Sequence, residues 1–209
     1  MKTIHRLLPV FLSLLVLFEV IAYTTTITPP SEKYLQLYVL SSNGTANDYF
    51  PNNSPYVTVG QRMSWEFAVV NDMGFVQLVA ILVKLGNQST VEPNDTLISP
   101  AAAPLVTEFE QFVQANETWS IPFEWQVTNF TSAPDGRLHM ISLDIDNMTY
   151  VVQNPPSCSL TSCSLRLIFE LWTWNTDSAN FQIGWWNGEQ RRIAWLQLWF
   201  DLALNGGSK

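Results

Sequence analysis

Charged residues are scarce in this chain. Asp, Glu, Lys and Arg make up 13% of its 209 residues, about half of the 25% that a typical globular domain carries. Lys and Arg number 10 against 18 Asp plus Glu, which gives a formal net charge of −8 at pH 7. A nucleic-acid-binding protein needs a basic surface for its phosphate contacts. The charge balance therefore argues against a nucleic-acid partner.

The side chains that carry out catalysis are also few. His139 is the only histidine beyond the N-terminal apolar segment, and no Gly-x-Ser-x-Gly motif surrounds a serine. Glu108 with Glu110, and Asp144 with Asp146, are i, i+2 pairs that fit the solvated face of a strand better than a glycosidase acid pair. There is no phosphate loop, no dinucleotide fingerprint and no complete calcium loop. We therefore expect a protein that is not an enzyme and that holds no cofactor or metal.

Cysteine is limited to Cys158 and Cys163, in the segment Cys-Ser-Leu-Thr-Ser-Cys. Two thiols without further ligands do not make a tetrahedral zinc site. A local disulfide suits a protein of an oxidising compartment. We expect a Cys158–Cys163 disulfide that stabilises mainly its own loop.

The N-terminal segment predicts export. Basic residues precede an apolar run over residues 7–23, the pattern of a signal peptide or of an anchor whose downstream chain is exported. Residues 7–18 have the length of a signal-peptide core, and Val20-Ile21-Ala22 is a suitable cleavage site. Continued through Ile27, the segment reaches 21 residues, and about 20 cross a bilayer. Glu19 adds a cost to that crossing.

Two regions follow from this pattern. Residues 1–30 are expected to be a signal peptide or an N-terminal membrane anchor with a short linker, and we favour the retained anchor. Residues 31–209 are expected to be an extracellular domain. No second span is predicted, because the late apolar run over residues 193–204 is too short and contains Asp201.

Asn-x-Ser/Thr sequons are frequent. The chain has seven, against about two expected by chance from its Asn, Ser and Thr content. In an exported protein they mark surface turns that carry glycans; the alternative is a loop composition rich in Asn and Thr without glycans. The predicted acceptors are Asn43, Asn52, Asn87, Asn94, Asn116, Asn129 and Asn147.

The hydrophobic pattern after the leader is that of strands. Met63, Trp65, Phe67 and Val69 alternate with other residues, the period of a half-buried strand. Clusters of Asn, Pro, Gly, Asp and Ser separate the apolar runs, as turns require, and residues 100–110 are the nearest candidate for a helix. The pattern predicts an all-β protein, an immunoglobulin-like antiparallel β-sandwich preceded by one N-terminal hydrophobic helix. The expected strands are residues 34–40, 63–70, 75–85, 105–113, 119–127, 138–145, 165–174 and 193–204.

Residues 34–71 resemble a known family. Their motifs are, in order, a strand over residues 34–40, Asn43-Gly44-Thr45-Ala46, Asp48-Tyr49, Pro51-Asn52 and Val57-Thr58-Val59-Gly60. This order resembles the archaeal domain-of-unknown-function family 1616, in which membrane helices accompany an exported β domain. The resemblance implies the same topology and a location at the cell membrane. It supplies no catalytic residues.

Tryptophan is concentrated late in the chain, since six of the nine lie between Trp172 and Trp199. Large aromatic side chains dominate sandwich cores and protein interfaces, and core packing is the first interpretation. Exposed aromatic faces on a sheet also stack on sugar rings. Trp185 and Trp186, next to the turn Asn187-Gly188, are the pair that we expect to be exposed and the candidate binding residues.

Three hypotheses on function follow. The first is a non-enzymatic, glycosylated, single-pass cell-surface protein in a structural or protein–protein assembly role at the cell envelope. It would contact the membrane through its N-terminal helix, and other surface proteins or copies of itself through the exported domain. The second is a secreted subunit of an extracellular filament, in which residues 23–40 add a strand to a neighbour's sheet. The third is a carbohydrate-binding module that uses the late tryptophans to bind glycans.

Overall fold

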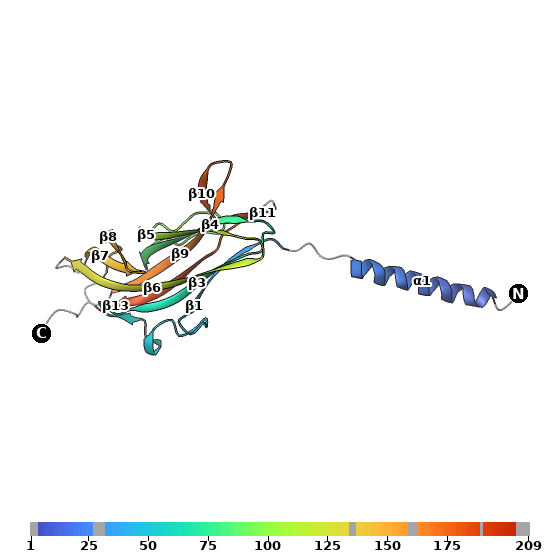
Figure 1. The fold of residues 1–209 in the computed structure, drawn as a ribbon, viewed down its shortest axis with the longest axis horizontal. Helices are drawn as coiled ribbons and strands as arrows, with labels where there is room; N and C mark the ends of the chain where they lie inside the picture. The colour runs from blue at the N-terminus through green and yellow to red at the C-terminus, as the bar shows by residue number, and fades with distance from the viewer. Residues whose placement is uncertain (1–3, 27–31, 134–136, 159–162, 189, 204–209) are drawn as a thin grey trace. The chain divides into compact units, whose positions relative to one another are not determined.

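The computed structural model describes residues 4–26, 32–133, 137–158, 163–188 and 190–203, with side chains in the N-terminal helix from residue 11 to 24. The chain divides into two compact units, Met1–Glu32 and Lys33–Lys209. Each unit is described by itself (Figure 1). Residues 27–31 of the predicted linker lie outside the described residues.

The first unit contains the predicted N-terminal helix, α1 (Ile4–Thr26). Leu, Val and Phe fill its middle, and the side chains of Phe11, Leu14, Leu17 and Phe18 are exposed. Among the residues that the structure describes, no helix has both the length and the apolar character needed to cross a membrane.

The second unit is built from strands that are joined by turns and by longer connections such as residues 42–55 and 88–104. Among its described residues, one 3-10 turn, η1 (Pro51–Asn53), lies between strands. The strands are β1 (Leu35–Ser41), β2 (Tyr56–Val57), β3 (Met63–Asn71), β4 (Gln77–Asn87), β5 (Leu105–Val113), β6 (Glu117–Ser132), β7 (Leu138–Ile145), β8 (Met148–Gln153), β9 (Cys163–Asn175), β10 (Asn180–Ile183), β11 (Trp185–Asn187), β12 (Gln190–Arg192) and β13 (Trp195–Leu202).

Two sheets face each other, which confirms the predicted β-sandwich. One has the order β1-β3-β6-β7-β8 and the other β2-β13-β9-β4-β5, with β10 pairing on β9 and a separate β11–β12 hairpin. Among the described strands, only β2 and β13 pair in parallel. The run β13-β9-β4-β5 has the G-F-C-C′ order of an immunoglobulin variable domain. The β9–β10 hairpin projects from one end of the sandwich (Figure 1).

Aromatic rings from both sheets fill the space between the layers. Trp65 and Trp125 come from the first sheet and are about 1% exposed. The Phe67 and Phe169 ring centroids, one from each sheet, are 4.3 Å apart, and those of Trp125 and Phe200 are 5.0 Å apart. The period-2 pattern that predicted β3 therefore places its large side chains in the core.

The predicted strands correspond closely to observed ones, with differences at the ends. The strands over residues 105–113 and 138–145 have the predicted bounds, so the helix considered for residues 100–110 is not formed. The chain turns at Gly74, where φ is +80°, and β4 starts at Gln77 rather than at residue 75. Strands β2, β8, β10, β11 and β12 were not predicted. Four of them have only two to four residues, whereas β8 has six, with Met148, Tyr150, Val151 and Val152 among them.

A buried polar layer, which the sequence did not predict, lies on the outer face of the second sheet. Arg166 on β9 is 1% exposed. It donates hydrogen bonds to the Glu92 carboxylate and to the Gln197 side-chain carbonyl, and a further one to the Thr90 carbonyl oxygen at 2.6 Å. Its guanidinium lies 4.8 Å from the centroid of the Trp199 ring. These contacts fasten the connection between β4 and β5 to the sheet.

A candidate binding groove beside the β9–β10 hairpin

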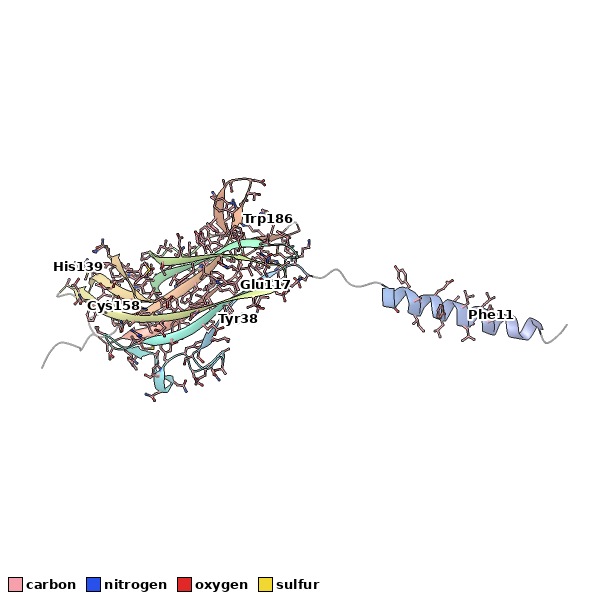
Figure 2. All side chains as sticks on the ribbon, in the orientation of Figure 1. Phe11, Tyr38, Glu117, His139, Cys158 and Trp186 are labelled. Atoms are coloured by element: carbon pink, nitrogen blue, oxygen red, sulfur yellow. A yellow bond between two sulfur atoms is a disulfide. The ribbon has the colours of Figure 1, made fainter. Side chains whose placement is uncertain are left out.

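A groove of about 460 Å³ opens beside the base of the β9–β10 hairpin. Its walls come from the turn between β3 and β4, the end of β5, the hairpin itself and β11. Figure 2 places Trp186 at this end of the β unit, close to the hairpin. The lining residues are Met73, Phe75, Val76, Gln77, Leu78, Phe112, Thr173, Trp174, Asn175, Thr176, Asp177, Gln182, Trp185 and Trp186.

Strand register brings the apolar part of this lining together. The pairing of β5 with β4 places Phe112 opposite Leu78, and the pairing of β10 with β9 places Phe181 opposite Trp174. Because β4 and β9 are themselves neighbours, Phe112, Leu78 and Trp174 of the lining come together at this end of the sheet, and Phe181 lies beside Trp174 outside the lining. The Trp174 and Phe181 rings meet edge to face at 5.3 Å between centroids.

Several of these side chains are open to solvent. The exposed fraction is 52% for Phe75, 64% for Phe112, 38% for Trp174 and 55% for Trp186. A scattered apolar residue on a surface is ordinary, whereas a group that lines one concave site marks a place of binding.

Of the predicted exposed pair, Trp185 and Trp186, only Trp186 is exposed. Trp185 is 8% exposed and packs against the core, so the expectation for this residue is wrong. Successive side chains of a strand point to opposite faces, and β11 turns Trp185 inward and Trp186 outward. The groove therefore has Trp186 as an accessible ring, and Trp185 belongs to the buried structure beneath it.

Gly184 makes this placement of β11 possible. Its φ is +74°, and a Cβ atom added there would lie 1.9 Å from the carbonyl oxygen of Arg192. Only glycine permits both the left-handed conformation and this close approach of two backbone segments. The backbone just before β11 therefore lies directly against the end of β12 at Arg192.

Polar groups accompany the rings. The Asn175 side-chain oxygen accepts hydrogen bonds from the backbone N–H groups of Asp177 and Ser178, at 2.8 and 3.1 Å, and Gln182 Nε2 donates to Ser178 Oγ at 3.0 Å. The Asn175 amide nitrogen, the Gln182 side-chain oxygen and the Asp177 carboxylate have no hydrogen-bond partner among the residues that the structure describes. The described lining contains one carboxylate and no basic residue.

Six of the seven predicted glycan acceptors are exposed on the surface, and none of them lines this groove. Three of them, at turns, have a positive φ: 56° for Asn52, 60° for Asn116 and 66° for Asn147. Asparagine tolerates this left-handed conformation well. The exposed acceptors are Asn43, Asn52, Asn94, Asn116, Asn129 and Asn147.

Asn87 departs from the expected exposed position. It is 8% exposed, and its Nδ2, the atom that a glycan would occupy, donates to the Ser157 carbonyl oxygen at 2.8 Å. Its side-chain oxygen accepts hydrogen bonds from Ser89 and Thr90. A glycan on Asn87 would break this arrangement, so we withdraw Asn87 from the predicted acceptors.

The predicted Cys158–Cys163 disulfide is confirmed. Cys163 begins β9 and is fully buried, so the bond joins the preceding loop to the core; residues 159–162 between them lie outside the described residues. Figure 2 shows Cys158 at the end of the β unit opposite Trp186. The disulfide is therefore remote from the groove.

The remaining candidates do not converge on one place. Glu108 and Glu110 are exposed neighbours on β5, and His139 and Asp146 are exposed elsewhere. Asp144 accepts a hydrogen bond from Thr149 Oγ1 at 2.6 Å. Within the described ranges, no three His, Cys, Asp or Glu side chains gather as a metal site would require.

The strand-addition hypothesis for residues 23–40 stays a prediction, because β1 lies at the edge of its sheet. Residues 35–41 form β1, which pairs with β3 of the same chain from Leu35 opposite Asn71 to Ser41 opposite Trp65. The side of β1 that faces β3 is thus occupied, no strand pairs with its other side among the described residues, and residues 23–26 belong to α1.

Comparison with known proteins gives weak structural similarities. No family model matches the chain, and no curated protein matches it. Similar solved structures include the CARDB domain of a Pyrococcus furiosus protein in complex with di-metal ions (10% identity, TM-score 0.39, 84% of this chain and 97% of that chain). A β-glucosidase from Listeria innocua in complex with laminaribiose matches over 82% of this chain and 16% of its own (12% identity, TM-score 0.36). At these scores the similarities say nothing about function, and the resemblance to family 1616 stays a prediction.

Proposed function

We propose that this protein is an exported, glycosylated and non-enzymatic protein of the cell surface, with a structural or assembly role at the envelope that it performs by binding. The observation that carries the proposal is the groove beside the β9–β10 hairpin, which presents Phe75, Phe112, Trp174 and Trp186 to solvent in one concave site. Exposing this much aromatic surface costs stability and solubility unless a partner covers it.

The chemistry of the lining favours binding over catalysis. Acid–base catalysis of hydrolysis requires a paired acid and base or nucleophile at a defined separation. The described lining offers Asp177 as its one carboxylate, with no histidine, cysteine or lysine beside it.

The sequence supports export and glycosylation. The basic and then apolar N-terminal segment has the composition of a signal peptide or anchor, and six sequon asparagines lie exposed on the β unit. The resemblance to the archaeal family 1616 agrees with a place at the cell membrane. If the leader is retained, the protein stays on the membrane; if it is cleaved, the β unit is released as a secreted or filament-forming subunit.

Intact-mass and N-terminal analysis of the protein from the cells that produce it tests this proposal. We expect a mass above that of the polypeptide, reduced by enzymatic or chemical deglycosylation, in the membrane or envelope fraction. A chain that begins near Met1 identifies an anchored protein, and one that begins near Tyr23 identifies a released subunit. An unglycosylated chain recovered in the cytoplasm would overturn the proposal.

A further inference from the structure

We infer that the groove beside the β9–β10 hairpin binds a neutral oligosaccharide, whose sugar rings lie against Trp174, Trp186 and Phe112. This inference rests on the proposed function as a surface binding protein and names the ligand class of its site. Three features of the groove support this inference: accessible aromatic faces, polar groups without a hydrogen-bond partner among the described residues, and a lining with one carboxylate and no basic residue.

The aromatic faces fit sugar rings. An aromatic face is electron-rich, and the C–H groups on one side of a pyranose ring form a weakly positive apolar surface that packs on it. Trp186 and Phe112 are more than half exposed, and Trp174 is 38% exposed. They come from three separate strands, β11, β5 and β9. A chain of two or three sugar rings can therefore contact more than one of them.

The unpaired polar groups fit hydroxyls. The Asn175 amide nitrogen is a donor, and the Gln182 side-chain oxygen and the Asp177 carboxylate are acceptors. None of these atoms has a hydrogen-bond partner within the described parts of the chain. The hydrogen bond from the Asp177 backbone N–H holds the Asn175 side chain in place, and the one to Ser178 holds the Gln182 side chain. A sugar hydroxyl both donates and accepts, so it satisfies either kind of group.

Charge selects a neutral sugar. The described lining has Asp177 and no Lys or Arg, and the whole chain has a net charge of −8. A sulfated or uronic saccharide, a phospholipid headgroup or a nucleic acid would meet this negative charge and would find no cation among the lining residues. Strand pairing places a basic residue, Arg191 on β12, opposite Trp186 and next to the groove.

The size of the groove favours a saccharide over a folded protein. Its volume of about 460 Å³ lies in the range of small-ligand sites, about 300 to 1,000 Å³. A stable protein interface covers about 800 Å² on each partner and is apolar at its centre. Here polar side chains lie directly beside the rings.

Titration of the full-length protein with neutral oligosaccharides of two to six units tests the inference. The probes are cello-, laminari-, manno- and chito-oligosaccharides. Tryptophan fluorescence and calorimetry measure their binding. We expect saturable binding of at least one series, and we expect Trp174→Ala and Trp186→Ala each to weaken it by about tenfold or more, as the loss of a stacking contact of 1.4 kcal/mol would. Trp186→Phe, which keeps an aromatic face, should retain most of the affinity.

Tyr56→Ala is the matched control, because Tyr56 is an aromatic residue that is 65% exposed on β2 and does not line the groove. It should leave binding unchanged within about twofold. Circular dichroism of each variant shows that the fold is kept; Trp185 is not varied, because it is buried.

Binding that survives both groove substitutions, or no binding of any of the four series, would overturn the inference. If an envelope protein binds the groove instead, the saccharide assignment fails while the proposed surface function, tested by mass and location, stands.

Discussion

Lys84 and Glu170 form an ion pair inside the protein, with Lys84 Nζ 2.9 Å from Glu170 Oε2. The side chains are 8% and 0% exposed. Glu170 also accepts a hydrogen bond from Trp172 Nε1 at 3.0 Å and one from the backbone N–H of Ala101. Lys84 donates to the Ala101 carbonyl oxygen at 3.0 Å. The pair thus holds both the N–H and the C=O of one residue in the β4–β5 connection.

Removing one member of this pair should strongly destabilise the fold. Glu170→Leu leaves the Lys84 ammonium buried without its counter-charge, and breaking a buried pair in this way costs about 3–5 kcal/mol. The double variant Lys84→Met/Glu170→Leu should recover most of that loss, because no charge is then left alone. Guanidinium unfolding of the wild type and of the two variants measures the effect. Equal stability of Glu170→Leu and the double variant would contradict it.

The Glu92–Arg166 contact should make the β4–β5 connection sensitive to acid. The hydrogen bond from Arg166, and then that from Gln197, holds the pKa of the Glu92 carboxyl below its ordinary value of 4.5. A lowered folded pKa stabilises the protein above pH 4.5, and this contribution is lost as the pH falls through the folded pKa. The protection factors of residues 88–104 against hydrogen exchange, which compare the observed rate with the intrinsic rate at each pH, should therefore fall below pH 4.5 in the wild type.

Glu92→Gln supplies the control for this pH effect. The glutamine cannot ionise, so the protection factors of the β4–β5 connection should be lower at neutral pH than in the wild type and should change less as the pH is lowered. Any loss of protection at low pH that remains in the Glu92→Gln variant comes from the other carboxylates of the chain. A wild type and a Glu92→Gln variant with parallel pH profiles would show that Glu92 does not control this segment.

Gly184 and Gly188 offer a comparison of two glycines with positive φ. Gly188→Ala adds a Cβ that meets nothing within 4 Å, so it should cost only the left-handed backbone penalty of about 1–2 kcal/mol. Gly184→Ala brings its Cβ against the Arg192 carbonyl oxygen and should cost more than about 3 kcal/mol, since backbone must move. Thermal unfolding measures both. Equal losses of stability in the two variants would show that the backbone at Gly184 does not lie against the Arg192 carbonyl oxygen.

Site mapping of glycans should separate Asn87 from the other sequons. The Asn87 Nδ2 is bonded to Ser157 in the fold, so the peptide that contains it should be recovered unmodified. Peptides with exposed acceptors, such as Asn43 and Asn147, should carry glycan. The measurement is peptide mass spectrometry after deglycosylation in heavy-oxygen water, which marks each formerly occupied asparagine. Full occupancy of Asn87 would require this corner of the fold to form after glycan transfer.

Much of the fold could be predicted from local pattern. The alternation of Met63, Trp65, Phe67 and Val69 is a property of one strand, and it predicted both β3 and the face that enters the core. The short spacing of Cys158 and Cys163 likewise predicted their disulfide. The short strands β2 and β10 to β12 were missed, because two to four residues carry little local signal; β2 in addition depends on pairing with the distant strand β13.

The candidate site was predicted only in part. The sequence pointed to the late tryptophans and to Trp186 in particular, but it gave no reason to join them with Phe75 and Phe112, which lie far earlier in the chain. Nor did it distinguish Trp185 from Trp186, since the side of a strand that faces the core depends on what packs against it. Trp174 has no feature in the sequence that sets it apart from the other late tryptophans.

By itself, the sequence determined the class of the fold, the N-terminal helix, the disulfide and the acidic, charge-poor character of the chain. These follow from periodicity, composition and short spacing, which act between residues close in sequence. Only the tertiary structure decided that Lys84, Arg166 and Glu170 are buried, that Asn87 is closed to modification, and that rings from β5, β9 and β11 share one groove. Each of those outcomes depends on strand pairing between distant segments, because pairing and packing fix which polar groups find a partner and which aromatic faces stay open to solvent.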